Sequence, residues 1–140
     1  MTGAAISNRE DLSTNHSLFI VPTRRDGFMA SIRGRAIELE DPTDDPFAPT
    51  PDELLILSIA SDSAWHARRF LRDNGLAADV NVTVTWRTLA DPPRLADVSL
   101  TVDVPAVSET TGEALLSALE ERAAVRSLDD PPHIHLSCER

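Results

Sequence analysis

Four polar residues that could perform acid–base or ion-binding chemistry interrupt an otherwise apolar segment. They are Ser58, Asp62, His66 and Arg69, and a helical period brings them onto one narrow stripe. In one interpretation the stripe lines a polar pocket, where Asp62 orients or deprotonates His66 and the pair acts as a general base. In the other, the pair is a structural ion pair within the helix or a hydrogen bond at an interface. The sequence leaves both interpretations open.

A second group of such residues lies near the C-terminus. His133 and His135 share one face of a strand predicted over residues 133–138, whereas Cys138 falls on the opposite face. Because these side chains do not converge and no acidic ligand accompanies them, we predict no metal site and no cofactor. Cys138 is the only cysteine, which excludes an intrachain disulfide and a two-cysteine peroxidase cycle within one chain.

Length and composition limit the class of protein. The 140 residues suffice for one domain with a real core but not for two. The net charge of −10 disfavours nucleic acid and anionic membranes as partners. No apolar run reaches the roughly 18 residues that span a bilayer. Residues 1–16 are polar and without periodicity, which predicts a flexible arm, and residues 17–140 are expected to form a single domain. The N-terminus shows no secretory signal, so we expect a cytoplasmic protein.

Alternation of apolar and polar residues predicts strands along much of the chain. Residues 18–21 predict a short strand, and residues 28–40 predict a hairpin that turns at Arg33-Gly34. Residues 80–104 predict a second hairpin, in which the alternation is clean over both arms.

Two helices separate these strands. The first is predicted over residues 52–73 with a stop at Asn74-Gly75, and the second over residues 108–122 with Ser108 as its N-cap. Hairpins joined by helices are typical of an α+β domain with antiparallel sheet. The first helix is apolar on nearly every side, and one chain of this size supplies little more than one sheet to cover it. We therefore expect a homodimer.

Several segments resemble the OsmC/Ohr family, the osmotically inducible and organic-hydroperoxide-resistance proteins. The resemblance covers roughly residues 18–137. The segments that carry it are Pro-Thr-Pro-Asp-Glu-Leu-Leu (49–55), Ala-Ser-Asp (60–62), Arg-Arg-Phe-Leu (68–71) and Asp-Pro-Pro-Arg (91–94). The resemblance implies antiparallel sheets packed on a long central helix and an intertwined homodimer with a pocket at the subunit boundary. It also implies thiol-dependent reduction of organic hydroperoxides.

Asp62 and Arg122 stand where the resemblance places the two redox cysteines of the family. A carboxylate cannot replace a thiolate that is oxidised by peroxide and then regenerated by a thiol. Glu53 matches the carboxylate that holds the activating arginine in the family, or it simply complements the dipole of the helix N-terminus. Because an unpaired buried carboxylate is costly, we expect an arginine to pair with Asp62, with Arg25 as the first candidate.

Two hypotheses of different classes follow from these residues. The favoured one is a non-redox binding or structural homodimer with a degenerate peroxidase site, in which a small-molecule ligand occupies the subunit interface or the pocket serves only the dimer. The alternative is an enzyme. It would either be a peroxide-stress enzyme that reduces organic hydroperoxides through Cys138, or perform non-redox chemistry through Asp62 and His66. The sequence names no ligand, no substrate and no definite catalytic residue.

Overall fold

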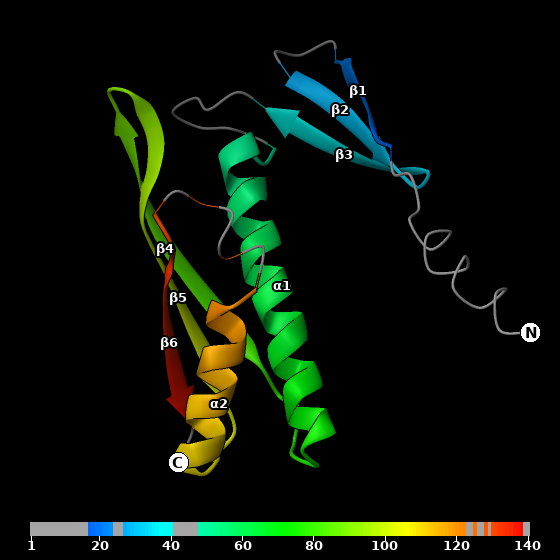
Figure 1. Ribbon diagram of the computed structural model, residues 1–140. Coiled ribbons are helices and arrows are strands. Elements are labelled where there is room, and N and C mark those ends of the chain that lie inside the picture. The colour runs from blue at the N-terminus through cyan, green and yellow to red at the C-terminus, as the bar shows by residue number, and fades with distance from the viewer. Residues whose placement is uncertain are drawn as a thin grey trace, which may run out of the picture. The chain divides into compact units, whose positions relative to one another are not determined.

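The computed structural model describes residues 17–23, 27–40, 48–122, 125, 128 and 130–138 (Figure 1). The chain divides into two compact units, one up to Pro51 and one from Asp52 onward, and each is described by itself. The predicted arm over residues 1–16 and Arg25 lie outside the described residues. The expectation of a single domain over residues 17–140 stays a prediction.

Three antiparallel strands form the first unit. They are β1 (Phe19–Pro22), β2 (Gly27–Ile32) and β3 (Arg35–Glu40), in the spatial order β1-β2-β3. The β2–β3 turn is made by Arg33 and Gly34, whose φ angles are 50° and 73°. Two-residue loops with positive φ match the twist of the strands they join. The short first strand and the hairpin at Arg33-Gly34 are confirmed.

The long helix α1 (Pro51–Asp73) opens the second unit. Proline suits its first turn, and Asp52 and Glu53 complement the positive end of the helix dipole. At its C-terminus, Gly75 adopts a φ of 69°, and the Leu76 N–H donates to the carbonyl of Leu71 over 2.9 Å. The Gly75 N–H donates to Arg72 over 3.0 Å, which completes a Schellman motif. The predicted stop at Asn74-Gly75 is therefore confirmed.

The sheet of the second unit has the order β4-β5-β6, with strands β4 (Asn81–Ala90), β5 (Pro93–Val104) and β6 (His133–Cys138). β4 and β5 form the predicted antiparallel hairpin, with a register shift between Thr85 and Arg87. β6 runs parallel to β5, which corrects the expectation of purely antiparallel sheets. The chain returns through helix α2 before it forms β6, and such a crossover permits parallel pairing.

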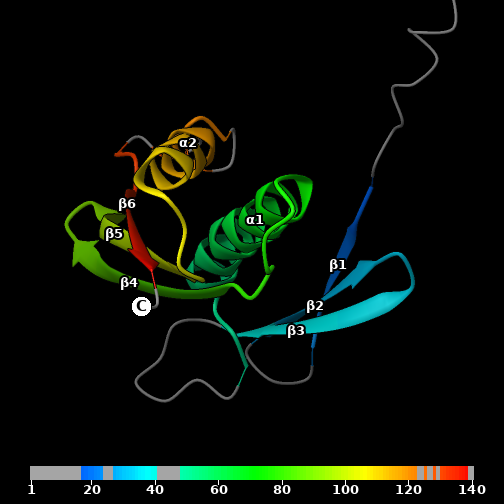
Figure 2. The same ribbon diagram turned by 90° about the horizontal axis from the view of Figure 1, so that it is seen from below.

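Helix α2 (Glu109–Glu120) lies on the same face of this sheet as α1 (Figure 2). The Ser108 hydroxyl accepts a hydrogen bond from the Thr111 N–H over 3.2 Å, which confirms Ser108 as the N-cap. The helix ends at Glu120 with Glu121 as its C-cap, so the predicted span of residues 108–122 is slightly too long. Arg122 therefore follows the helix and is not part of it.

The core of the second unit lies between the two helices and the sheet. Alternate residues of β5 face inward, and one stripe from each helix packs onto them. The most deeply buried apolar side chains are those of Ile56, Ile59, Ala67, Leu71, Leu100, Val102, Leu115 and Leu119. This packing fixes how α1 and α2 face each other, and so determines which polar side chains can meet across them.

The other side of α1 carries large apolar side chains that the rest of the second unit does not cover. Leu55, Leu57 and Trp65 are exposed by 42%, 58% and 61%. The sequence predicted that this helix needs cover on nearly all sides, and the sheet and α2 supply it on one side. The homodimer that would cover the rest stays a prediction.

Candidate functional site

An ion pair between the two helical segments is the centre of the candidate site. The guanidinium of Arg122 donates from Nε to Oδ2 of Asp62 and from Nη2 to Oδ1, each over 3.3 Å. The side chains are 23% exposed at Asp62 and 39% exposed at Arg122. Two parallel bonds of this kind hold arginine and carboxylate in one relative orientation. Asp62 thus has the arginine partner that its partial burial requires, and that partner is Arg122.

The backbone places Arg122 at this point. Its N–H donates to the carbonyl of Leu119 over 3.2 Å, and Leu119 is buried in the core. The chain is therefore held as it leaves α2, and the arginine side chain reaches across to α1. Arg25, the partner that the sequence favoured, lies outside the described residues.

His66 is the second neighbour of Asp62. Its Nε2 lies 3.5 Å from Oδ1 of Asp62, one helical turn away. This is a close contact but is longer than a well-formed N–H···O hydrogen bond. The predicted stripe therefore exists, although the Ser58 hydroxyl donates to the carbonyl of Leu55 within its own helix over 2.7 Å. Asp62 lies between a histidine and an arginine that approach it from different elements.

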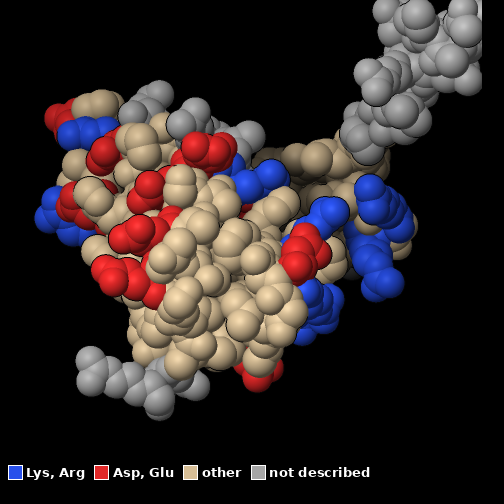
Figure 3. All heavy atoms as spheres, turned by 60° about the horizontal axis from the view of Figure 1, so that its bottom comes forward, with Lys and Arg blue, Asp and Glu red and all other residues tan. Residues whose placement is uncertain are grey.

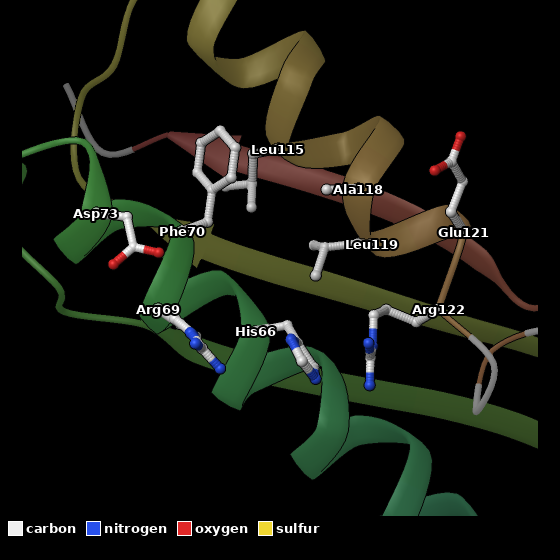
Figure 4. A pocket seen from close by; sticks show the side chains of 9 residues that line it. All are labelled: His66, Arg69, Phe70, Asp73, Leu115, Ala118, Leu119, Glu121 and Arg122. Atoms are coloured by element: carbon white, nitrogen blue, oxygen red, sulfur yellow. The ribbon is translucent and has the colours of Figure 1, made fainter. Parts of the chain in front are cut away.

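A groove of about 420 Å³ runs beside this pair, between α1 and α2 (Figure 4). One wall comes from the last turns of α1 and the other from α2 and the residues that follow it. The lining residues are His66, Arg69, Phe70, Asp73, Leu115, Ala118, Leu119, Glu121 and Arg122. Its volume falls in the range of small-molecule sites, which combine apolar walls with a few polar groups.

Polar and apolar groups are segregated within the groove. Figure 4 shows the basic side chains of Arg69, His66 and Arg122 along one edge, and the acidic side chains of Asp73 and Glu121 toward its two ends. The apolar side chains of the groove lie between α1 and α2. The arrangement can hold a molecule that has one polar end and one apolar body.

The charges of the whole chain do not prevent such a local basic edge. The net charge is −10, but the charges are not spread evenly, and uncharged side chains cover a broad area of the face shown in Figure 3. At an ionic strength of 0.15 M, charges more than about 8 Å apart are largely screened from each other at the surface. A ligand in the groove therefore responds mainly to the groove's own charged groups.

The remaining sequence-predicted residues do not join this site. Glu53 is exposed in the first turn of α1, about 14 Å along the helix axis from Asp62. Cys138 is exposed at the end of β6, where it pairs in register with Val104. Leu136 of the same strand lies beside the beginning of α2, so the only thiol is near the opposite end of α2 from Arg122.

His133 and His135 project from the exposed side of β6, as the alternation predicted, while Ile134 between them is buried. Among the residues that the structure describes, no group of three or more histidine, cysteine or acidic side chains is placed to hold a metal ion. Neither of the helices in this part of the chain has the length and hydropathy that a membrane-spanning segment needs.

Sequence reasoning missed the contribution of α2 to the groove. Leu115 and Leu119 read as ordinary core positions, and Glu121 carried no signal. One signal could have revealed the pairing of Asp62 and Arg122. The family resemblance put both residues at the positions of two cysteines that work together, and residues that replace such a pair are candidates for mutual contact.

These features define a protein with the OsmC-like α+β fold, and the resemblance noted from the sequence is confirmed at the level of the fold. No protein-family model matches the chain, and no curated protein matches it. Solved structures do match it.

An OsmC-like protein from Mycoplasma pneumoniae is 14% identical and has a TM-score of 0.78, with 92% of this chain and 100% of that chain covered. The organic hydroperoxide resistance protein OsmC of Legionella pneumophila, described as a predicted redox protein, is 14% identical and has a TM-score of 0.63, with 91% of this chain and 98% of that chain covered. The organic hydroperoxide resistance protein OhrB of Bacillus subtilis is 10% identical and has a TM-score of 0.62, with 90% of this chain and 98% of that chain covered.

Proposed function

We propose that this chain is an OsmC-like protein whose peroxide-reducing centre has been replaced by an ion pair, and that its α1–α2 groove binds a small molecule. The observation that carries the proposal is the contact between Asp62 and Arg122, with two bonds of 3.3 Å. By the family resemblance, these residues occupy the two cysteine positions. A charge pair now lies where the two thiols would work together.

The chemistry of the replacement supports a non-redox role. Reduction of a hydroperoxide by a thiol peroxidase begins with attack of a thiolate on the peroxide oxygen and leaves a sulfenic acid, which a thiol then reduces. A carboxylate already carries carbon at its highest oxidation level short of carbon dioxide, and it has no such cycle. The single thiol, Cys138, is exposed and is not a lining residue of the groove.

The form of the groove supports binding. Leu115 and Leu119 are packed in the core beneath the groove, and the guanidinium of Arg122 is oriented by its two hydrogen bonds to Asp62. Binding sites gain affinity when their groups are ordered before the ligand arrives. The mixture of apolar wall and basic edge matches a small organic ligand better than a macromolecule.

We also propose that the protein acts as a homodimer. Leu57 and Trp65 are large apolar side chains on α1 that the rest of the second unit leaves exposed. Contiguous apolar patches of this kind are typical of interaction surfaces. A second copy would cover α1, as the sequence pattern of this helix led us to expect.

A second candidate function is general-base chemistry by His66 and Asp62. The contact of 3.5 Å between Nε2 and Oδ1 favours it, because the carboxylate could orient the imidazole toward the groove that His66 lines. Replacing His66 with Ala should abolish such an activity on any substrate that the groove turns over. Ligand binding without any turnover would leave only the binding function.

The test of the proposed function is consumption of an organic hydroperoxide, such as cumene hydroperoxide, in the presence of a dithiol. Wild type and Cys138→Ser should both consume it no faster than the buffer with dithiol alone. Turnover by wild type that disappears in Cys138→Ser would contradict the proposal, because the thiol of β6 would then be the active group.

A further inference from the structure

We propose that the α1–α2 groove binds an organic acid with one carboxylate and an apolar chain or ring. The carboxylate would bind at the basic edge formed by Arg122, Arg69 and His66, and the apolar part would lie against Phe70 and Ala118, above the buried Leu115 and Leu119. This inference rests on the proposed function, because it names the kind of molecule that the binding groove takes.

Arg122 retains donors for a ligand. A guanidinium has five N–H groups in a fixed plane. Arg122 gives one from Nε and one from Nη2 to Asp62, so Nη1 and the second hydrogen of Nη2 remain available. Because Arg122 itself lines the groove, these remaining donors can reach an oxygen of a carboxylate there.

Arg69 adds a second positive charge to the same edge. It is an exposed side chain of α1 one turn from His66, and both line the groove. Within the described part of the chain, no carboxylate lies within 4 Å of its guanidinium, in contrast to Arg87 and Arg122. Asp73, four residues later on α1, also lines the groove, so a bound anion would compete with Asp73 for the guanidinium of Arg69.

The acidic residues restrict the ligand to one charge. Asp73 and Glu121 line the groove toward its two ends, on either side of the basic edge (Figure 4). A dicarboxylate long enough to extend along the groove would bring its second charge close to one of them. Repulsion of like charges is a common means of rejecting a wrong ligand. A monocarboxylate with an uncharged body avoids that repulsion.

The apolar wall accounts for the body of the ligand. Leu115 and Leu119 are exposed by 0% and 1%, so they form the packed floor beneath the groove, and the apolar side chains that a ligand can touch are the half-buried Phe70 and the exposed Ala118. An alkyl chain or a ring laid on this wall is removed from water on one side, which is favourable in proportion to the apolar area covered. The charged edge orients the ligand and the wall strengthens its binding.

Asp62 makes the proposal testable because it competes with the ligand for Arg122. Replacing Asp62 with Asn removes a negative charge and frees the donors of Arg122, so an anion should bind more tightly. Replacing Arg122 with Gln removes the anchor, so an anion should bind more weakly. If the groove bound its ligand through apolar contacts alone, the two substitutions would not change its affinity for an anion in opposite directions.

The experiment is calorimetric titration of the full-length protein with octanoate, with 1-octanol as the uncharged probe and octanedioate as the doubly charged one. Wild type should bind octanoate at least tenfold more tightly than either of the other probes. Arg122→Gln should weaken octanoate binding at least tenfold, Arg69→Gln should weaken it severalfold, and Asp62→Asn should strengthen it severalfold.

Arg68→Gln is the matched control. Arg68 is an exposed arginine on the same helix that does not line this groove, so its replacement should change octanoate affinity less than twofold. Arg69→Gln leaves the Asp62–Arg122 pair intact, which keeps the test valid if Arg122→Gln fails to fold. Equal effects of Arg68→Gln and Arg69→Gln would indicate general attraction and overturn the proposal.

The two proposals fail separately. Absence of octanoate binding at millimolar concentration, or equal affinity for octanoate and 1-octanol, overturns the ligand class and leaves the loss of peroxidase chemistry untouched. Hydroperoxide turnover by wild type overturns the non-redox function whatever octanoate does.

Discussion

Asp62 and Arg122 are separated by 60 residues in the sequence, and their side chains meet through two hydrogen bonds of 3.3 Å. One comes from the middle of a long helix and the other from the residue that follows the C-cap of a shorter one. Their meeting requires both helices to pack on the same face of one sheet. The contact between Asp62 and Arg122 therefore depends on the tertiary structure, because it forms only when the two helices are packed in this way.

The Asp62–Arg122 pair should contribute only modestly to stability. Both side chains keep some contact with water, and partly exposed ion pairs are typically worth about 0.2–1 kcal/mol. A double-mutant cycle with Asp62→Ala, Arg122→Ala and the double variant, measured by urea unfolding, should give a coupling energy in that range. A coupling above about 3 kcal/mol would show that the pair is a main structural support rather than part of a binding site.

A thiol placed at position 62 should be activated by its surroundings. In the variant that combines Asp62→Cys with Cys138→Ser, the guanidinium of Arg122 should lower the pKa of the new thiol below its usual value of about 8.5. The pH dependence of alkylation by iodoacetamide measures this pKa directly. Adding Arg122→Gln should move the midpoint back upward, and a midpoint at or above 8.5 before that change would contradict the expected proximity of Arg122.

The two glycines of the helical segments should respond in opposite directions to a methyl group. Gly75 has a φ of 69°, so Gly75→Ala should lower the free energy of unfolding by about 1–2 kcal/mol. Gly112 lies inside α2, and a Cβ there would meet Leu136 Cδ2 at an ordinary 3.6 Å. Gly112→Ala should therefore raise stability by about 0.5–1 kcal/mol. Urea unfolding of the Gly75→Ala and Gly112→Ala variants measures both changes in unfolding free energy, and equal changes would be inconsistent with the described backbone.

The proposed homodimer should depend on the exposed side of α1. Leu57→Arg places a charge on a side chain that is 58% exposed in the single chain, so it should weaken association without unfolding the protein. Light scattering after gel filtration should show a dimer for wild type and a monomer for the variant. Glu113→Arg, at an exposed position of α2, is the control and should remain dimeric. A monomeric wild type would refute the expected dimer.

Two lining residues of the groove, Leu119 and Ala118, should differ strongly in their importance for stability. Leu119 is 1% exposed, and Leu119→Ala should cost about 2–5 kcal/mol of unfolding free energy through the cavity it leaves. Ala118 lines the groove but is exposed, so Ala118→Ser should change stability by less than about 0.5 kcal/mol. Thermal unfolding of the two variants tests this contrast, and a comparable loss in Ala118→Ser would mean that the groove is packed shut.

Local elements of this fold were predictable because their causes are local. The Schellman stop at Gly75 depends on one residue that tolerates positive φ, and the cap at Ser108 depends on one hydroxyl three residues before its donor. The β4–β5 hairpin follows from alternation over two arms joined by a proline turn. Such signals act within a few residues and need no knowledge of the rest of the chain.

Directions and partners were not predictable in the same way. The sequence of β6 reads the same for parallel and antiparallel pairing, because alternation shows which face is buried and carries no information about the neighbouring strand. The predicted span of α2 was too long at both ends, since the exact end of a helix depends on competing hydrogen bonds. Arg122 was recognised as a substituted position but not as the partner of Asp62.

The sequence by itself determined the elements, the apolar character of α1, the stripe of Asp62 and His66, and the presence of one cysteine. These properties arise from residue type and from spacings shorter than a few turns. Only the tertiary structure decided that Arg122 reaches Asp62 and that α2 completes a groove beside them. Contacts between distant segments depend on how whole helices pack on a sheet, and that packing is set by the shared core and not by any single motif.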